Sequence, residues 1–167
     1  MSVARAAMLA FAAVVRLWAG TADAGTSDDD FGVGLSAFNR GDYRTALKKW
    51  QRLAEQEDPR SEEGIGFMYH RGLGVPVDDG AAAFWLRRAA EHGQPEGQLM
   101  FGILFYYGRG VTQSYVKAYA WCALADSNGN ADAALCSEAA LEMMSDHDRE
   151  EAFRLVVDLR RQYGTAR

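Results

Sequence analysis

Apolar residues recur at helical spacing along most of the chain, and this pattern predicts helices and no strand. Over residues 61–71, the apolar side chains of Ile65, Met68 and Tyr69 fall on one helical face. A glycine-rich stretch then ends this helix, and a second helix is predicted over residues 78–91. Its apolar residues follow i, i+3, i+4, i+7 spacing: Ala82, Trp85, Leu86 and Ala89.

This two-helix unit occurs twice, because residues 63–93 align without a gap with residues 99–129. All the matched identities lie 36 positions apart: Gly66 and Gly102, Gly72 and Gly108, Gly74 and Gly110, Val75 and Val111, Ala82 and Ala118, Trp85 and Trp121, Ala89 and Ala125, Gly93 and Gly129. A single hairpin cannot bury both of its faces, so neighbouring hairpins must stack. The chain is therefore predicted to be all-α, an α-solenoid of stacked helix–turn–helix repeats.

Further units flank the two matched ones. An earlier hairpin at about 28–58 has a shorter turn, since Gly34 and Trp50 are 16 positions apart against 19 for Gly66 and Trp85. Capping helices are expected within 131–163, the last over residues 146–163 with Ser145 as N-cap and Asp148 completing a capping box. With repeats at about 59–93 and 95–129, this arrangement gives about eight helices within a domain spanning residues 25–167.

The matched residues also predict how the helices pack. Gly66 and Gly102 lie inside the first helices, where glycine is tolerable if another helix passes too close for a Cβ atom. Trp85 and Trp121 have small residues three positions before and four positions after them. Both indoles are therefore expected to be largely buried between hairpins.

The pattern resembles the Sel-1-like repeat, a relative of the tetratricopeptide repeat. The first copy shows it at Ile65-Gly66, Tyr69, Gly72-x-Gly74-Val75, Ala82, Trp85, Ala89-Ala90 and Gly93. The second copy shows it at Phe101-Gly102, Phe105, Gly108-x-Gly110-Val111, Ala118, Trp121, Ala125 and Gly129, and departs from the family at Phe105 and Asp126. The resemblance implies a scaffold or adaptor that binds a protein or peptide partner.

Tetratricopeptide-type stacks usually present the first helix of each hairpin on a concave face. Carried over by position, the residues facing this groove are Phe31, Leu35, Phe38, Asn39, Glu63, Phe67, His70, Arg71, Leu99, Ile103, Tyr106 and Tyr107. They form a mostly apolar, aromatic stripe, and exposed stripes of this kind mark binding surfaces. The alternative is that the last helix or the N-terminal segment folds over the stripe.

Residues 1–24 have the layout of a secretory signal peptide. Arg5 precedes an apolar run, and Ala22-Asp23-Ala24 is a small-x-small site that predicts cleavage after Ala24. A periplasmic or secreted protein is expected, with no stable membrane span in the mature chain. A cytosolic leader and a retained anchor are the alternatives, since Arg16 interrupts the apolar stretch.

The two cysteines, Cys122 and Cys136, lie seven residues on either side of Gly129. Positions equidistant from the turn of an antiparallel helical hairpin lie at similar heights, so the two sulfurs can face each other. An exported protein permits a disulfide. Two buried thiols acting as small apolar side chains are the alternative.

Composition and charge narrow the function. The 167 residues are 49% hydrophobic and 25% charged, which are globular values. A net charge of −5 argues against nucleic acid as a partner. We find no phosphate loop, no nucleophile beside a base and no paired metal ligands, so no enzyme activity, cofactor or metal is expected. A protein-interaction module of the bacterial envelope is favoured over a structural or glycan-binding envelope protein, and a hydrolase comes third.

Overall fold

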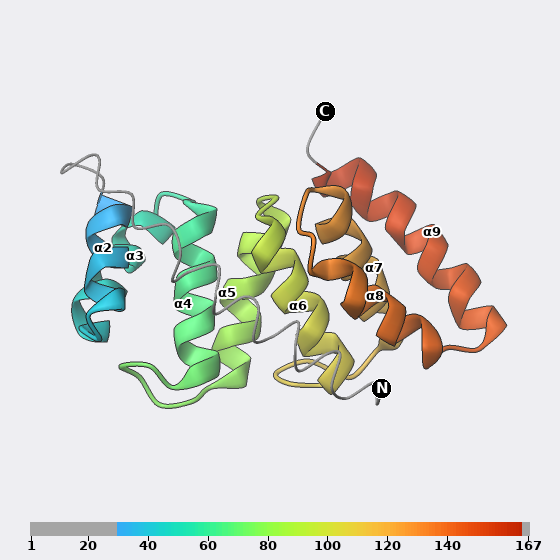
Figure 1. The fold of residues 1–167 in the computed structure, drawn as a ribbon, viewed down its shortest axis with the longest axis horizontal. Helices are drawn as coiled ribbons and strands as arrows, with labels where there is room; N and C mark the ends of the chain where they lie inside the picture. The colour runs from blue at the N-terminus through green and yellow to red at the C-terminus, as the bar shows by residue number, and fades with distance from the viewer. Residues whose placement is uncertain (1–29, 165–167) are drawn as a thin grey trace.

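A computed structural model describes residues 30–164, and in this range the chain forms eight helices and no strand. In chain order they are α2 (Asp30–Asn39), α3 (Tyr43–Ala54), α4 (Pro59–Arg71), α5 (Asp79–Glu91), α6 (Pro95–Tyr107), α7 (Tyr115–Ser127), α8 (Ala133–Glu142) and α9 (Asp146–Tyr163). Consecutive hairpins stand beside one another along the long axis of the molecule (Figure 1). The predicted all-α solenoid is confirmed.

The two matched hairpins begin and end their first helices in the same way. Pro59 and Pro95 occupy the first turns of α4 and α6, where the missing N–H costs no helical hydrogen bond. Gly72 and Gly108 end these helices with φ angles of 67° and 68°, a left-handed conformation that glycine adopts without strain. The 36-residue match in sequence is therefore also a match in backbone conformation.

In each of the first three hairpins, the two helices approach closely at a glycine of the first helix, where there is no room for a Cβ atom. A Cβ atom on Gly66 would lie 2.6 Å from Cγ of Leu86, so the helices pass as closely as expected. The residues that fill this position are 36 apart: Trp50 against Gly34, Leu86 against Gly66 and Cys122 against Gly102. Trp50 thus occupies the place of Leu86 and not that of Trp85.

The loop within each matched hairpin rests on the hairpin before it. A Cβ atom on Gly74 would lie 2.6 Å from Cβ of Tyr43, the first residue of α3. A Cβ atom on Gly110 would overlap the carbonyl oxygen of Asp79, the first residue of α5. Each loop therefore touches the start of the preceding second helix at the same point.

The last two helices depart from the hairpin geometry. The capping box of α9 is present as predicted, with Ser145 and Asp148 each accepting from the other's backbone N–H. However, α9 packs along α7 and makes few contacts with α8. Its inward residues are Ala152, Val156 and Leu159. The last helix thus lies against a second helix and leaves the first helices α4 and α6 uncovered by it.

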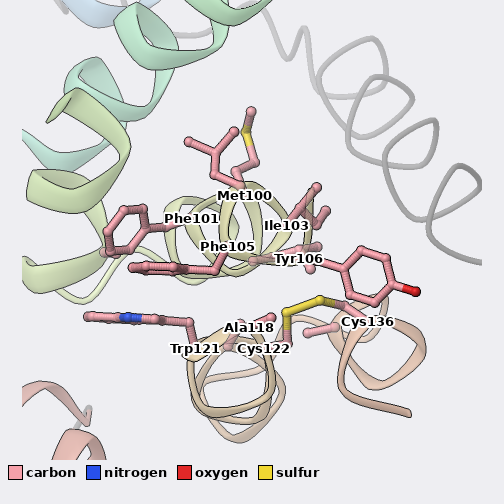
Figure 2. Packing of buried hydrophobic residues seen from close by; sticks show 14 of the residues in the cluster. Met100, Phe101, Ile103, Phe105, Tyr106, Ala118, Trp121, Cys122 and Cys136 are labelled. Atoms are coloured by element: carbon pink, nitrogen blue, oxygen red, sulfur yellow. A yellow bond between two sulfur atoms is a disulfide. The ribbon is translucent and has the colours of Figure 1, made fainter. Parts of the chain in front are cut away.

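The two equivalent tryptophans differ in burial. Trp121 is 7% exposed, with its ring 5.3 Å from that of Phe101 and 5.8 Å from that of Tyr163 on α9. Figure 2 shows its indole beneath the rings of Phe101 and Phe105. Trp85 is only partly buried, with the guanidinium of Arg88 over its ring at 5.4 Å. The expectation of largely buried indoles holds fully for Trp121 and less completely for Trp85, because α9 supplies an extra ring at Trp121.

Candidate functional site

The residues expected on the groove lie on α2, α4 and α6, which succeed one another along the stack together with α8 (Figure 1). Three of them are exposed: Asn39, Arg71 and Tyr107. These are the last residues of α2, α4 and α6, so their helices bring them to the same end of the stack. We call Asn39, Arg71 and Tyr107 the carboxyl edge.

The remaining stripe residues are less accessible than expected. Phe31, Leu35 and Phe38 are partly buried, whereas Glu63, Phe67, His70, Leu99, Ile103 and Tyr106 are buried. The expectation of an open apolar surface at Leu99 and Ile103 is wrong, because α6 contacts α4, α5, α7 and α8 and both residues join the larger core cluster. Phe67 joins the same cluster, with its ring 6.1 Å from that of Phe38.

His70 precedes Arg71 in the chain, is buried, and is paired with a carboxylate. Its Nδ1 donates to Oδ1 of Asp79 at 3.0 Å. Burial lowers the pKa of His70 and outweighs the opposing effect of Asp79, and the charges of Arg109 and Arg71 lower it further. His70 is therefore neutral at pH 7, and the nearby positive charge comes from the two arginines.

Tyrosine rings surround the end of α6. The ring of Tyr106 lies 5.0 Å from that of Tyr107 and 5.3 Å from that of Tyr115. Gln113 Nε2 donates to the carbonyl oxygen of Tyr106 at 2.8 Å and to the hydroxyl of Tyr115 at 3.2 Å. Burial raises the pKa of Tyr106, so its hydroxyl stays protonated. Tyr107, 42% exposed, presents the accessible ring of this group.

The structure also reveals a buried polar pairing that the sequence analysis did not identify. Glu62, fully buried on α4, accepts from His92 Nδ1 at 2.7 Å and lies 2.9 Å from Arg88 Nη2. At the equivalent positions, Asn128 Nδ2 donates to Gln98 Oε1 at 2.9 Å. The same 36-residue offset links Glu62 to Gln98 and His92 to Asn128, and this offset was the signal that could have found them.

Both pairings also reach the preceding second helix. Gln98 Nε2 donates to the carbonyl oxygen of Ala90 at 3.1 Å. The carboxylate of Glu62 cannot donate, and Arg88 Nη2 instead donates to the carbonyl oxygen of Ala54 at 3.3 Å. Charged side chains in one repeat (Glu62, Arg88 and His92) therefore link adjacent hairpins as the neutral amides of Gln98 and Asn128 do in the next repeat. These groups join hairpins and lie away from the carboxyl edge, so we assign them a structural role.

Cys122 on α7 and Cys136 on α8 form a disulfide, with their Cα atoms 5.9 Å apart (Figure 2). Of the two alternatives left open by the sequence, the structure contains the bonded form. The bond ties the third described hairpin to the helix that follows it. Cys122 is also the residue that faces Gly102, so the disulfide starts where the two helices of its hairpin approach closely.

None of the helices between residues 30 and 164 has the length and apolar character needed to cross a membrane. In the same range, no group of three His, Cys, Asp or Glu side chains is placed to hold a metal ion. The predicted signal peptide and its cleavage point after Ala24 lie outside the described residues.

Comparison with known proteins agrees with this geometry. The family model for the Sel1 repeat matches residues 59–94 and 95–130. A Sel1 repeat protein from Oxalobacter formigenes is 29% identical with a TM-score of 0.60, covering 74% of this chain and 96% of that one. No curated protein matches significantly.

A second solved structure is c5321, described as a protective antigen present in uropathogenic Escherichia coli strains displaying an SLR fold. It is 24% identical with a TM-score of 0.79 over 90% of this chain, and the match spans 33% of the antigen, about a third of its length. This likeness concerns the fold alone. The family-model match shows that the chain contains two consecutive Sel1 repeats, at residues 59–94 and 95–130.

Proposed function

We propose that the chain is a non-catalytic scaffold or adaptor that holds a peptide or partner protein along the carboxyl edge. Sel1 repeats generally mediate protein–protein interaction, and their fold is typically a non-catalytic scaffold. The observation that carries the proposal is that α2, α4 and α6 each end on an exposed residue at the same end of the stack. A row of contacts repeated from helix to helix suits an extended segment, whose own groups repeat along its length.

The three side chains differ in the chemistry they offer. The amide of Asn39 can donate to and accept from a peptide main chain. The guanidinium of Arg71 can pair with a carboxylate, and Arg109 adds positive charge nearby. Tyr107 offers an accessible ring. The partner segment expected here carries an acidic residue followed by an apolar or aromatic one.

A photo-crosslinking amino acid at position 107 tests this proposal directly. We expect the same partner protein to be trapped from position 107 and from position 71. The matched control is position 84 on α5, where Phe84 is 47% exposed but lies on a second helix. Crosslinks of equal yield from all three positions, or from position 84 alone, would contradict a partner at the carboxyl edge.

The second candidate is a glycan-binding envelope protein, and the tyrosine group around Tyr107 favours it. Aromatic rings can stack on sugars. The ring centroid of Tyr106 lies 5.0 Å from that of Tyr107 and 5.3 Å from that of Tyr115. Sedimentation with purified peptidoglycan separates the two functions. Binding that is lost in Tyr107→Ala, together with no protein crosslink at position 107, would favour the glycan.

We further propose an envelope location, periplasmic or secreted. The predicted signal peptide and the disulfide between Cys122 and Cys136 support it, because disulfides persist in oxidising compartments and are rare in the cytosol. N-terminal sequencing of the protein from fractionated cells should find Gly25 as the first residue in the periplasmic or extracellular fraction. A cytosolic protein that begins near Met1 and carries two free thiols would refute this location.

A further inference from the structure

The row of exposed helix ends continues past Tyr107 onto α8. Left-handed glycines precede both α6 and α8, Gly93 with a φ of 83° and Gly129 with a φ of 104°, and in both cases the next residue donates its N–H to a carbonyl oxygen at 3.0 Å. The 36-residue register therefore reaches α8, and it makes Met143 the counterpart of Tyr107. Met143 directly follows α8 and is 48% exposed, so a fourth first helix ends on an accessible side chain.

Two acidic side chains accompany Met143. Glu138 and Glu142 are exposed and lie one turn apart on α8, so they are adjacent on its surface. Within residues 30–164, neither carboxylate takes part in an ion pair. α8 contacts α6, and burial, the two neighbouring tyrosines and the charge of Glu142 together raise the pKa of Tyr106. The row thus passes directly from the tyrosine rings to negative charge.

Two cations on neighbouring helices make other contacts. Arg149 on α9 donates from Nη2 to the carbonyl oxygen of Leu141 at 3.3 Å, and its Nη1 lies 3.4 Å from Oδ1 of Asp146. Lys117 on α7 lies with its Nζ 5.3 Å from the ring centroid of Phe105. Both cations therefore already have partners, and the end of α8 remains acidic.

On the α4 side, the row is positive. Arg71 ends α4, and Arg109 belongs to the loop that rests on Asp79 at the start of α5. Burial is the main cause that lowers the pKa of His70, and the charges of both arginines lower it further, so both lie close to it. Asp79 is already bonded to His70, and Asp78 accepts from a backbone N–H of α5. Within residues 30–164, Arg109 takes part in no ion pair.

We propose that the partner segment bound at the carboxyl edge continues onto α8 and carries an acidic, an apolar and a basic residue in that order along the row. The acidic residue pairs with Arg71 and Arg109, the apolar one contacts Tyr107 and Met143, and the basic one pairs with Glu142. This inference rests on the proposed function, because it extends the same row. Charge complementarity selects this occupant, since cations at one end and anions at the other disfavour a segment of uniform charge.

Helix geometry sets the spacing of the three residues. α6 contacts both α4 and α8, and packed helices lie about 8–10 Å apart. An extended chain advances about 3.3 Å per residue, so neighbouring positions of the row match residues about three apart. A seven-residue peptide with Glu first, Phe fourth and Lys last therefore reaches from Arg71 to Glu142.

Fluorescence polarisation with the purified chain tests the proposal. The probes are Glu-Ser-Ser-Phe-Ser-Ser-Lys and the same peptide with its last residue changed to Ser or to Glu, each labelled with fluorescein through the same linker. The peptide ending in Lys should bind about threefold more tightly than the one ending in Ser, because a single exposed ion pair is weak. It should bind about tenfold more tightly than the peptide ending in Glu, which adds repulsion. Glu142→Lys should reverse the preference between Lys and Glu.

The matched control is Glu55→Lys, which makes the same change in net charge. Glu55 is exposed and directly follows α3, so it lies at the other end of the stack, because the two helices of a hairpin run antiparallel. This variant should leave the order of the three peptides unchanged. Circular dichroism should show the same helix content in both variants.

Arg71→Glu separates failure of this inference from failure of the proposed function. Affinities that ignore the last residue of the peptide, or a preference that Glu142→Lys leaves unchanged, would overturn the extension onto α8. If Arg71→Glu still weakens binding in that case, the proposed function stands. Binding that is indifferent to Arg71→Glu as well, or no binding of any of the three peptides, would overturn both.

Discussion

Replacing Arg88 with methionine should destabilise the stack strongly, although Arg88 lies partly at the surface. Glu62 is fully buried, and its carboxylate oxygens lie 2.9 Å from Arg88 Nη2 and 2.7 Å from His92 Nδ1. Arg88→Met keeps an apolar stem beside Trp85 but leaves the buried carboxylate with one partner. Removing one partner of a buried charge pair costs about 3–5 kcal/mol. The Arg88 side chain is 28% exposed, so water reaches the site and the lower end of this range is expected.

The second repeat supplies the internal reference for this prediction. Gln98 is equally buried at the position equivalent to Glu62, and it is neutral. Glu62→Gln should therefore cost only about 1 kcal/mol, since the new amide can donate to the carbonyl oxygen of Ala54 as Gln98 donates to that of Ala90. Combining Glu62→Gln with Arg88→Met should restore stability relative to Arg88→Met alone. The coupling between the two changes should reach about 1.5 kcal/mol.

Guanidinium unfolding followed by far-ultraviolet circular dichroism measures all three variants. Arg87→Met is the matched control, because Arg87 is exposed and lies 3.8 Å from Glu91 as an i,i+4 pair worth about 0.5 kcal/mol or less. The reasoning is refuted if Arg88→Met costs no more than Arg87→Met. It also fails if adding Glu62→Gln makes the Arg88→Met protein less stable, because a neutral amide would then be worse placed than an unpaired carboxylate.

Three further predictions concern other parts of the stack. Cys136→Ser should lower the free energy of unfolding by up to about 3 kcal/mol. Alkylation of the unmodified chain without a reductant should leave its mass unchanged, and a gain in mass would show free thiols. In thermal melts, Trp121→Ala should cost about 4 kcal/mol and Trp85→Ala about 2 kcal/mol, and the reverse order would contradict their difference in burial. Burial holds the pKa of His70 below its usual value of about 6.5. As the pH falls below that value, His70 is protonated in the unfolded chain before it is protonated in the native chain. Stability should therefore fall on acidification, and His70→Gln should flatten the fall; an unchanged pH profile would exclude His70 as its source.

The helices and their order could be predicted because the 36-residue match carries turn residues as well as apolar ones. A helix expected over 78–91 is observed at Asp79–Glu91, and the last helix has the predicted bounds. The disulfide could be foreseen as an alternative, because equidistance from a hairpin turn depends on sequence separation alone. Local spacing determines all these features, so one sequence was enough to predict them.

Exposure along the stripe could not be predicted, because it depends on which helices flank each position. Leu99 and Tyr107 lie on the same helix, yet Leu99 is fully buried and Tyr107 is 42% exposed. Trp85 and Trp121 are equivalent in the repeat, but Tyr163 reaches only Trp121. No periodicity connects Tyr163 to Trp121, since α9 abandons the hairpin arrangement and packs on α7. Similarly, the shorter first turn concealed that Trp50 faces Gly34 as Leu86 faces Gly66.

The packing of each loop on the preceding hairpin affects how a chain of this kind can gain repeats during evolution. The contact joins a loop glycine of one unit to the first residue of the second helix of the unit before it. It is made by Gly74 on Tyr43 and, 36 residues later, by Gly110 on Asp79. Every 36-residue unit therefore carries both halves of the joint. After a tandem duplication of residues 59–94, the loop of the inserted copy would pack on the second helix of the repeat before it. The second helix of the inserted copy would in turn receive the loop of the repeat after it. Gene duplication can thus lengthen the array one hairpin at a time without the evolution of a new interface.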